Sequence, residues 1–303
     1  MNSNKKCAGI IGTGYYAPEK VLTNFDLEKI VDTNNEWIVE RTGIKERRVA
    51  EADVPMSELA FKAAQMALVD AKVEADDIDL IIMATLTSDR VIPSTSCILQ
   101  HRLGAKKAAA FDLSAACSGF VYASTIAAQF IETGVYKKVL VVAAETLSKY
   151  VDWEDRNTCI LFGDGAGAAV FGEVESGYGL LGMDLGSDGS GGDVLDIPAS
   201  GSLHPATLET IANRMHYIHM DGKAVFKFAV KVMGETVLQS LAKAGLDKTD
   251  IDCLVPHQAN IRIIQSAAKR LNLPMEKVVV NVERYGNTSA ASIPLALAEA
   301  ARS

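Results

Sequence analysis

Short runs of consecutive apolar residues alternate along the chain with longer segments in which apolar residues recur every three or four positions. Three of the runs are typical of strands buried on both faces of a sheet: residues 78–85, 107–113 and 138–144. The helical spacing predicts helices over residues 55–69 and 93–103, and an apolar, nearly uncharged helix follows Cys117. Together these elements predict an α/β fold.

Glycine-rich segments give two further predictions. Residues 163–167 (GDGAG) lie between the apolar runs 159–162 and 168–171, which predicts a tight hairpin. A phosphate-binding loop is not expected there, because no helix follows the last glycine. Residues 177–222 are rich in Gly, Ser and Asp, and we expect surface loops with one short helix near 206–215.

An internal repeat relates the two parts of the chain. Residues 67–82 align without gaps on residues 240–255, so that Leu68 falls on Leu241 and the Asp-Ile-Asp of 77–79 falls on 250–252. Further along, the segment 114–117 can be set against 289–292. We therefore expect two similar α/β halves related by a pseudo-twofold axis, residues 1–172 and 173–303.

The repeat also carries an expectation about the end of the chain. In the first half, the helix after Cys117 is followed by the strand 138–144 and the predicted hairpin. In the second half, the corresponding helix over 291–302 is followed only by Ser303. We expect from this comparison that the second half is truncated at its C-terminal end.

Composition and charge exclude several classes of function. The net charge of −8 argues against nucleic acid as a partner, and no run approaches the roughly 20 apolar residues of a membrane helix. The cysteines are odd in number, widely spaced and without a CxxC pair, which argues against a disulfide framework or a metal site: Cys7, Cys97, Cys117, Cys159 and Cys253. A soluble, cytoplasmic protein is expected.

Three residues with reactive or hydrogen-bonding side chains lie where predicted strands end. Cys117 lies at the start of its apolar helix, where free N–H groups and the helix dipole favour a thiolate. His257 follows a buried strand that ends at residue 255, and Asn287 follows the predicted strand 278–282. If the pseudo-twofold brings these ends together, Cys117 forms a thioester while His257 and Asn287 stabilise an oxyanion. Singly, each residue also has an ordinary structural interpretation.

Four motifs carry a resemblance to a known family: DLSAACSGF, FGDGAGAAV, PHQANIRI and YGNTSAAS. With them, the whole chain resembles the β-ketoacyl-acyl-carrier-protein synthase III family, the thiolase-like condensing enzymes that initiate bacterial type II fatty acid synthesis. The resemblance implies a layered αβαβα fold, a homodimer and catalysis by Cys117, His257 and Asn287. Cys117 would accept an acyl group from acetyl-CoA or another short acyl-CoA, and malonyl-acyl-carrier protein would then be decarboxylated and condensed with it. No cofactor or metal is implied.

The resemblance also implies binding roles. Trp37 and Arg156 would hold the CoA adenine, Arg41 would lie near the CoA phosphates, and Asn260 would contact the pantetheine arm. Four basic residues would dock the acidic carrier protein, a contact that salt should weaken: Lys227, Arg262, Lys269 and Arg270. A solvated helix face is the alternative interpretation of these four, and Trp37 can also be a structural anchor.

The acyl pocket departs from the family pattern. Phe162 would line it, and Ile92 stands where the family often has Phe contributed across the dimer interface. A smaller, branched side chain at this position leaves the preference for acetyl open and would admit longer or branched primers.

Other activities are compatible with some of these features. A papain-like cysteine hydrolase of acyl thioesters would use the same residue types, but the repeat argues against it. A degenerate, non-catalytic dimer partner would be expected to lack the cysteine, the histidine or the asparagine. Related thiolase-fold acyltransferases of polyketide or HMG-CoA synthase type remain alternatives.

Overall fold

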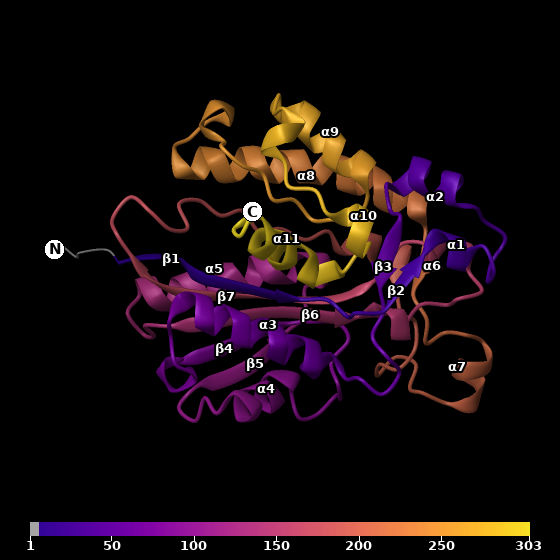
Figure 1. Cartoon of the computed structure of the whole chain (residues 1–303), viewed down its shortest axis with the longest axis horizontal. Coiled ribbons are helices and arrows are strands. Elements are labelled where there is room, and N and C mark those ends of the chain that lie inside the picture. The colour runs from indigo at the N-terminus through magenta and orange to yellow at the C-terminus, as the bar shows by residue number, and fades with distance from the viewer. Residues whose placement is uncertain (1–5) are drawn as a thin grey trace.

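A five-stranded mixed sheet forms the centre of the molecule in the computed structural model, which describes residues 6–303 (Figure 1). The order across the sheet is β1-β7-β6-β4-β5. Its strands are β1 Cys7–Tyr16, β4 Leu80–Ala84, β5 Ala109–Leu113, β6 Val139–Thr146 and β7 Asp164–Val174. The predicted strands over 78–85, 107–113 and 138–144 are therefore confirmed.

The strands differ in direction. β4 pairs in parallel with both β5 and β6, whereas β7 pairs antiparallel with β6 and with β1. The parallel strands β4 and β6 are buried along their whole length, in agreement with their continuous apolar sequences. β5 is the edge strand next to β4, and its residues are only partly covered.

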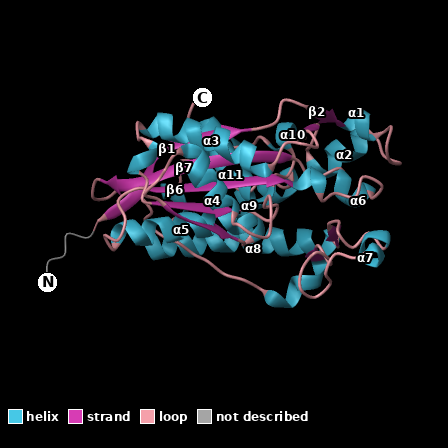
Figure 2. Ribbon diagram, turned by 90° about the horizontal axis from the view of Figure 1, so that it is seen from below, coloured by secondary structure: helices cyan, strands magenta, loops and turns pink. Residues whose placement is uncertain are grey.

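Helices cover both faces of the sheet. On one face lie α3 (Met56–Ala71) and α4 (Thr95–Leu103), which pack on alternate residues of the strands such as Ile81 and Leu140. On the other face lies α5 (Gly119–Glu132), packed on the intervening residues such as Ile82 and Val141. Figure 2 shows the strands enclosed between these helical layers.

α11 (Ser292–Ala300) lies on the same face of the sheet as α5, and α8 (Gly222–Ala244) and α9 (Ile261–Leu271) lie farther from the sheet on that side. α11 packs against β7 and β1, and α8 packs against α9. In Figure 1, α11 lies between the sheet and the α8–α9 pair.

The predicted short helix near 206–215 is α7, Leu208–Ala212. Shorter helices and two further strand pairs complete the α-helices and strands of residues 6–303: α1 Asn24–Leu27, α2 Asn35–Thr42, α6 Arg156–Cys159, α10 Val282–Tyr285, β2 Val21–Thr23 with β3 Glu46–Arg48, and β8 Leu195–Asp196 with β9 His219–Met220. Within residues 6–303, no helix is both long enough and apolar enough to cross a membrane.

The hairpin predicted for residues 159–171 is wrong. Residues 156–159 form α6, Gly163 precedes the single long strand β7, and Gly165 and Gly167 lie within that strand. These glycines serve packing, because a Cβ atom on Gly167 would lie 2.5 Å from the backbone nitrogen of Leu295 and 2.6 Å from the carbonyl carbon of Pro294. Glycine therefore lets α11 approach the sheet closely.

The predicted strands around residues 254 and 278–282 are also wrong. Only a parallel bridge between Leu254 and Val278 forms, held by Leu254 N–H to Lys277 O (2.8 Å) and Val279 N–H to Leu254 O (2.9 Å). Residues 282–285 turn into α10 instead. A pair of strands with no third strand beside it contributes little stability, which explains why the pairing stops after one bridge.

The backbone repeats at the spacing that the sequence alignment indicates. Lys72 and Gly245, which end α3 and α8, both have positive φ (54° and 72°). Ala116 and Ser289 also share a positive φ (46° and 47°), and each begins a short 3-10 turn before a helix. Both pairs have the same separation in sequence as Leu68 and Leu241. The alignment of 114–117 with 289–292 was therefore displaced by two residues, and the division at 172/173 stays a prediction.

Candidate active site

Cys117 lies in the 3-10 turn Ala116–Ser118, which joins the end of β5 to the start of α5. The left-handed φ of 46° at Ala116 turns the chain sharply just before the cysteine. The side chain is half-buried. The prediction that Cys117 lies at a helix N-terminus, after a strand, is confirmed.

The expected preference for a thiolate is not met. Burial raises the pKa of the Cys117 thiol above its ordinary value, although the nearby Ser289 hydroxyl and the Cys117 backbone oppose that rise. The resting side chain is therefore a thiol at neutral pH. Withdrawal from water costs the charged form more than these two polar groups return.

His257 lies in the loop that follows the Leu254–Val278 bridge. Its Nδ1 is 2.5 Å from the Ser292 Oγ at the start of α11. Burial lowers the pKa of His257 to about 4, so the ring is neutral at physiological pH. A neutral imidazole donates one hydrogen bond and accepts another.

Gln258 fixes the loop that carries His257. The side chain is buried, and its Nε2 donates to the carbonyls of Pro256 and Val279, each at 3.0 Å. Its Oε1 accepts from the N–H groups of Asn281 (3.0 Å) and Val282 (3.2 Å). All four hydrogen-bonding positions of the amide are thus used to join two loops, a role that the sequence motif did not reveal.

Asn287 is held by its backbone and by its side-chain oxygen. Its N–H donates to Leu161 O (2.8 Å) and its carbonyl accepts from Gly163 N–H (3.1 Å). Its Oδ1 accepts from the N–H of Ser289 at 2.8 Å. Because the oxygen is engaged in this way, the Nδ2 group is the part of the amide left to donate to a ligand.

The segment 289–292 links the three candidate catalytic residues. The Ser289 N–H donates to Asn287, the Ser289 side chain lies close enough to Cys117 to affect its pKa, and Ser292 contacts His257. The 3-10 turn that holds Cys117 also packs on the turn that begins at Ser289. A thiol, a neutral imidazole and an amide donor are thus gathered around one short segment, a set suited to thioester chemistry with a developing oxyanion.

Glu145, at the end of β6, is a second buried polar group that sequence reasoning missed. It accepts from the hydroxyls of Thr85 (3.2 Å) and Thr87 (2.6 Å) and from the N–H groups of Leu86 (3.1 Å) and Thr87 (3.2 Å). Burial raises the pKa of Glu145 to about 8 against these hydrogen bonds, and a charge on Cys117 would raise it further. Glu145 therefore ties the loop after β4 to the end of β6.

Trp37, Arg41 and Arg156 lie together on the surface. The guanidinium carbons of Arg41 and Arg156 are 4.6 and 5.3 Å from the centre of the Trp37 indole. Arg156 also donates to the backbone carbonyl of Asp32 at 3.0 Å. The structure thus brings together three of the four residues predicted to bind CoA, with cationic groups over an aromatic face.

The remaining predicted binding residues lie on or beside α8 and α9. Asn260 caps α9 by accepting from Arg262 N–H (2.9 Å), and its Nδ2 donates to the Arg41 carbonyl (2.9 Å). The four basic residues are exposed: Lys227, Arg262, Lys269 and Arg270. Arg270 is partly engaged, since it donates to Glu235 at 3.2 Å across the α8–α9 contact.

The two predicted pocket residues have different environments. Phe162 is buried and forms a bridge to Asn287, so it lies next to a candidate catalytic residue. Ile92 is 81% exposed, and Val91 beside it is 91% exposed. Ile92 can therefore contribute to a pocket only if another chain covers it.

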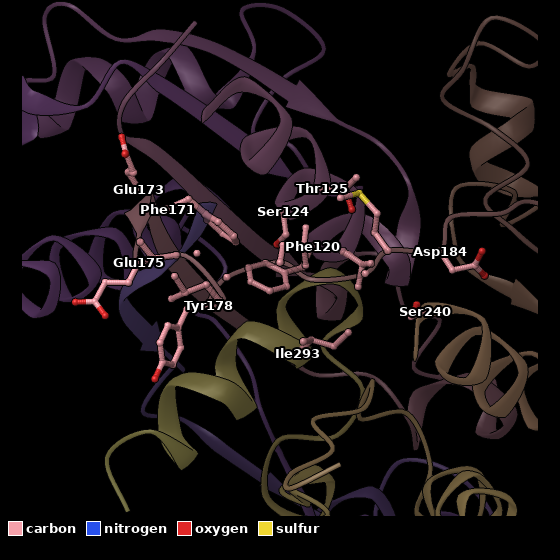
Figure 3. A pocket seen from close by; sticks show the side chains of 18 residues that line it. Phe120, Ser124, Thr125, Phe171, Glu173, Glu175, Tyr178, Asp184, Ser240 and Ile293 are labelled. Carbon is pink, nitrogen blue, oxygen red and sulfur yellow. The ribbon is translucent and has the colours of Figure 1, made fainter. Parts of the chain in front are cut away.

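A cavity of about 1150 Å³ lies beside α5, and its lining does not include Cys117, His257 or Asn287 (Figure 3). It is lined by α5, the start of β1, the end of β7 and the segment 175–184 that follows it, together with single residues of α8 and α11; Phe120, Phe171 and Ile293 are among its apolar side chains. The candidate catalytic residues thus lie outside it, and the cavity has no part in the arrangement described above.

Comparisons with known proteins give the family. A family model described as 3-oxoacyl-[acyl-carrier-protein (ACP)] synthase III matches residues 111–189, and its C-terminal counterpart matches residues 241–303. A β-ketoacyl-[acyl-carrier-protein] synthase III of Desulfitobacterium hafniense is 63% identical over 97% of this chain and 89% of that protein.

Solved structures agree with the sequence matches. The 3-oxoacyl-[acyl-carrier-protein] synthase III of Aquifex aeolicus is 50% identical, with a TM-score of 0.89 over 97% of this chain and 91% of that one. The priming β-ketosynthase of the R1128 polyketide pathway is 38% identical, with a TM-score of 0.89 over 100% and 90% of the two chains. The α/β, thiolase-like fold that the motifs implied is confirmed, and the chain belongs to the β-ketoacyl-[acyl-carrier-protein] synthase III family of condensing acyltransferases.

Proposed function

We propose that Cys117, His257 and Asn287 carry out the decarboxylative condensation with which this family starts fatty acid synthesis. The chain is an acyltransferase that joins an acyl-CoA to malonyl-acyl-carrier protein, as its family shows. The observation that supports these three residues is their contact with the segment 289–292.

In the first half-reaction, Cys117 loses its proton and its sulfur attacks the thioester carbonyl of a short acyl-CoA. A carbon–sulfur bond forms to Cys117, the bond to the CoA sulfur breaks, and CoA leaves with the proton as a thiol. The turn at Ala116 and the following helix N-terminus present N–H groups near the reacting carbonyl, where negative charge develops.

In the second half-reaction, malonyl-acyl-carrier protein loses carbon dioxide and leaves an enolate. His257 and the Nδ2 group of Asn287 donate hydrogen bonds to the enolate oxygen, which lowers the barrier to decarboxylation. The enolate carbon then attacks the Cys117 thioester, a carbon–carbon bond forms, and the Cys117 sulfur leaves and takes a proton from water. The scheme balances with the two substrates and one proton from solvent, so it requires no cofactor.

The half-reactions can be tested separately. Intact mass after incubation with acetyl-CoA should show one added acetyl group on the wild-type protein and none on Cys117→Ala. His257→Ala and Asn287→Ala should acquire the acetyl group yet lose condensation with malonyl-acyl-carrier protein by about 10²-fold or more. Acylation of Cys117→Ala, or full condensation by His257→Ala, would refute the assignment.

The binding surfaces follow from the same family. The Trp37, Arg41 and Arg156 cluster offers an aromatic face and cationic groups to the adenine and phosphates of CoA. The exposed basic residues of α8 and α9 offer a complementary surface to the acidic carrier protein, and Asn260 lies between these two surfaces. The proposed location is the cytoplasm, where both substrates are made.

A homodimer is proposed from the edge of the sheet. Within residues 6–303, β5 pairs only with β4 and leaves the apolar side chain of Phe111 36% exposed, and the loop that carries Val91 and Ile92 is exposed nearby in sequence. An uncovered apolar edge strand is a surface that proteins bury against a second chain. A second copy covering this edge would bring Ile92 to the partner's acyl pocket, where its smaller side chain would admit branched primers.

A further inference from the structure

The hydroxyl of Ser292 accepts one hydrogen bond and is close to a second polar atom. The backbone N–H of Gln258 donates to the Ser292 Oγ at 3.3 Å, and the Nδ1 of His257 lies 2.5 Å from the same oxygen. Ser292 is only 2% exposed, so water does not compete for its hydroxyl group. The direction of the bond to His257 then follows from the position of the hydroxyl proton.

That proton has one acceptor among the described residues. A backbone N–H can only donate, so the bond from Gln258 uses a lone pair of the Ser292 oxygen and leaves its hydrogen free. A buried hydroxyl hydrogen is costly to leave unpaired. Across residues 6–303, the only other group hydrogen-bonded to Ser292 Oγ is His257 Nδ1. The hydroxyl therefore donates to Nδ1, and Nδ1 accepts.

We propose that Ser292 is a positioning residue that holds His257 in the tautomer with its proton on Nε2. This inference rests on the proposed function, because it specifies which ring nitrogen donates to the enolate oxygen. In the opposite tautomer, Nε2 would present a lone pair to that oxygen and repel the developing charge. Ser292 thus acts through His257 on decarboxylation and leaves the attack of Cys117 on acyl-CoA untouched.

The packing of α11 holds the hydroxyl in place. Ser292 is the first residue of α11, and the next turn of this helix, at Pro294 and Leu295, rests against Gly167 of β7. His257, the other partner of this hydrogen bond, is held by Gln258, whose side chain joins the two loops around it. Both partners of the 2.5 Å bond are therefore set by the core.

The tautomer can be read directly by NMR of the full chain with ¹⁵N-labelled histidine. The His257 signals are those that disappear in His257→Ala, and long-range ¹H–¹⁵N correlations distinguish a protonated ring nitrogen from an unprotonated one. We expect wild-type His257 to carry its proton on Nε2, with the Nδ1 signal of a nitrogen that accepts a hydrogen bond. A wild-type proton on Nδ1 would overturn the proposal, whatever the variants show.

The variants test whether Ser292 is the cause. Ser292→Ala should lose the Nδ1 signal of a nitrogen that accepts a hydrogen bond. Its condensation rate should fall by about 10-fold, less than the loss expected when a donor to the enolate oxygen is removed outright. Its acetylation rate should stay within about twofold of wild type. Ser292→Thr keeps a hydroxyl and should restore the Nδ1 signal and the condensation rate. Ser124→Ala is the matched control, because Ser124 is a buried helical serine whose hydroxyl has no hydrogen-bond partner among the described residues.

The outcomes separate this inference from the function on which it rests. Full condensation by His257→Ala would contradict the assignment of His257 itself. Loss of condensation in His257→Ala, together with an unchanged Nδ1 signal and rate in Ser292→Ala, would contradict only the role of Ser292. If Ser292→Ala does not fold, the wild-type tautomer and the Ser292→Thr spectrum decide the question.

Discussion

At the scale of single residues, the protonation state of Cys117 governs the first half-reaction. Its pKa is raised by burial, and the nearby Ser289 hydroxyl opposes that rise. Below its pKa, the thiolate fraction of a thiol increases tenfold for each unit of pH. The reactivity of Cys117 should therefore rise about tenfold per pH unit between pH 7 and 8.5, without reaching a plateau.

Removal of the Ser289 hydroxyl should make this cysteine less reactive. The polar Ser289 hydroxyl beside Cys117 holds the pKa of the thiol down, so without it that pKa rises further and Ser289→Ala should be alkylated by iodoacetamide more slowly than wild type at pH 8. The extent is measured peptide by peptide by mass spectrometry, with the exposed Cys97 and Cys253 as internal references. Equal or faster alkylation of Cys117 in Ser289→Ala would show that the hydroxyl does not stabilise the thiolate.

The sequence was enough to predict the reactive residues of the candidate active site, but not the side chains that hold them in position. Cys117, His257 and Asn287 could be predicted because each follows an apolar run, and such ends converge in α/β folds. Ser292 and Gln258 could not, since a serine at a helix start and a glutamine after a histidine are common. Their roles depend on the groups to which the Ser292 hydroxyl and the Gln258 amide are hydrogen-bonded, and these partners are fixed only when the loops pack together.

At the scale of elements, glycines in β7 decide how α11 packs. Gly167→Ala should destabilise the protein by about 1–3 kcal/mol or more, because its Cβ would lie 2.5 Å from the backbone of Leu295, which cannot rotate away. Urea unfolding measures the change. Gly192→Ala is the matched control, since a Cβ there meets no atom within 4 Å and should leave the free energy of unfolding nearly unchanged. Equal stability of the two variants would contradict this packing argument.

The same glycines explain why one element was predicted wrongly. A glycine-rich stretch between apolar runs fits a turn and also fits a strand on which a helix lies closely, and the sequence does not distinguish the two. By contrast, α3 and β4 were predicted well. The apolar residues of α3 recur at helical spacing along its buried face, and β4 is apolar at every position because both of its faces are buried. Local patterns thus predicted the elements whose burial follows one rule from end to end.

At the scale of the whole molecule, the repeat was visible in sequence but its details were not. The matching positive φ values at Ala116 and Ser289 show that both halves place a sharp turn before a central helix. That turn was aligned two residues away, because no side chain requires it: neither residue is glycine. Similarly, the pairing near Leu254 was overestimated, since strand formation depends on neighbours elsewhere in the sheet.

The exposed edge of the sheet leads to the prediction for the whole molecule. We propose that two copies associate along β5, where Phe111 is exposed on a strand that, among the described residues, is paired on one side only. Light scattering after size exclusion should then give about 65 kDa, twice the chain mass of 32.4 kDa. Phe111→Lys should shift the protein toward the monomer, because a lysine on an edge strand opposes pairing with another chain.

The control for this variant places the same charge elsewhere. Val69→Lys replaces a 79% exposed apolar residue on α3, away from β5, and should remain dimeric. Because Ile92 is 81% exposed within its own chain, the monomeric variant should also lose its discrimination among acetyl-, isobutyryl- and hexanoyl-CoA if the partner supplies this side chain. A wild-type monomer that discriminates among these primers would show that a single chain builds its acyl pocket alone, and that β5 has another role.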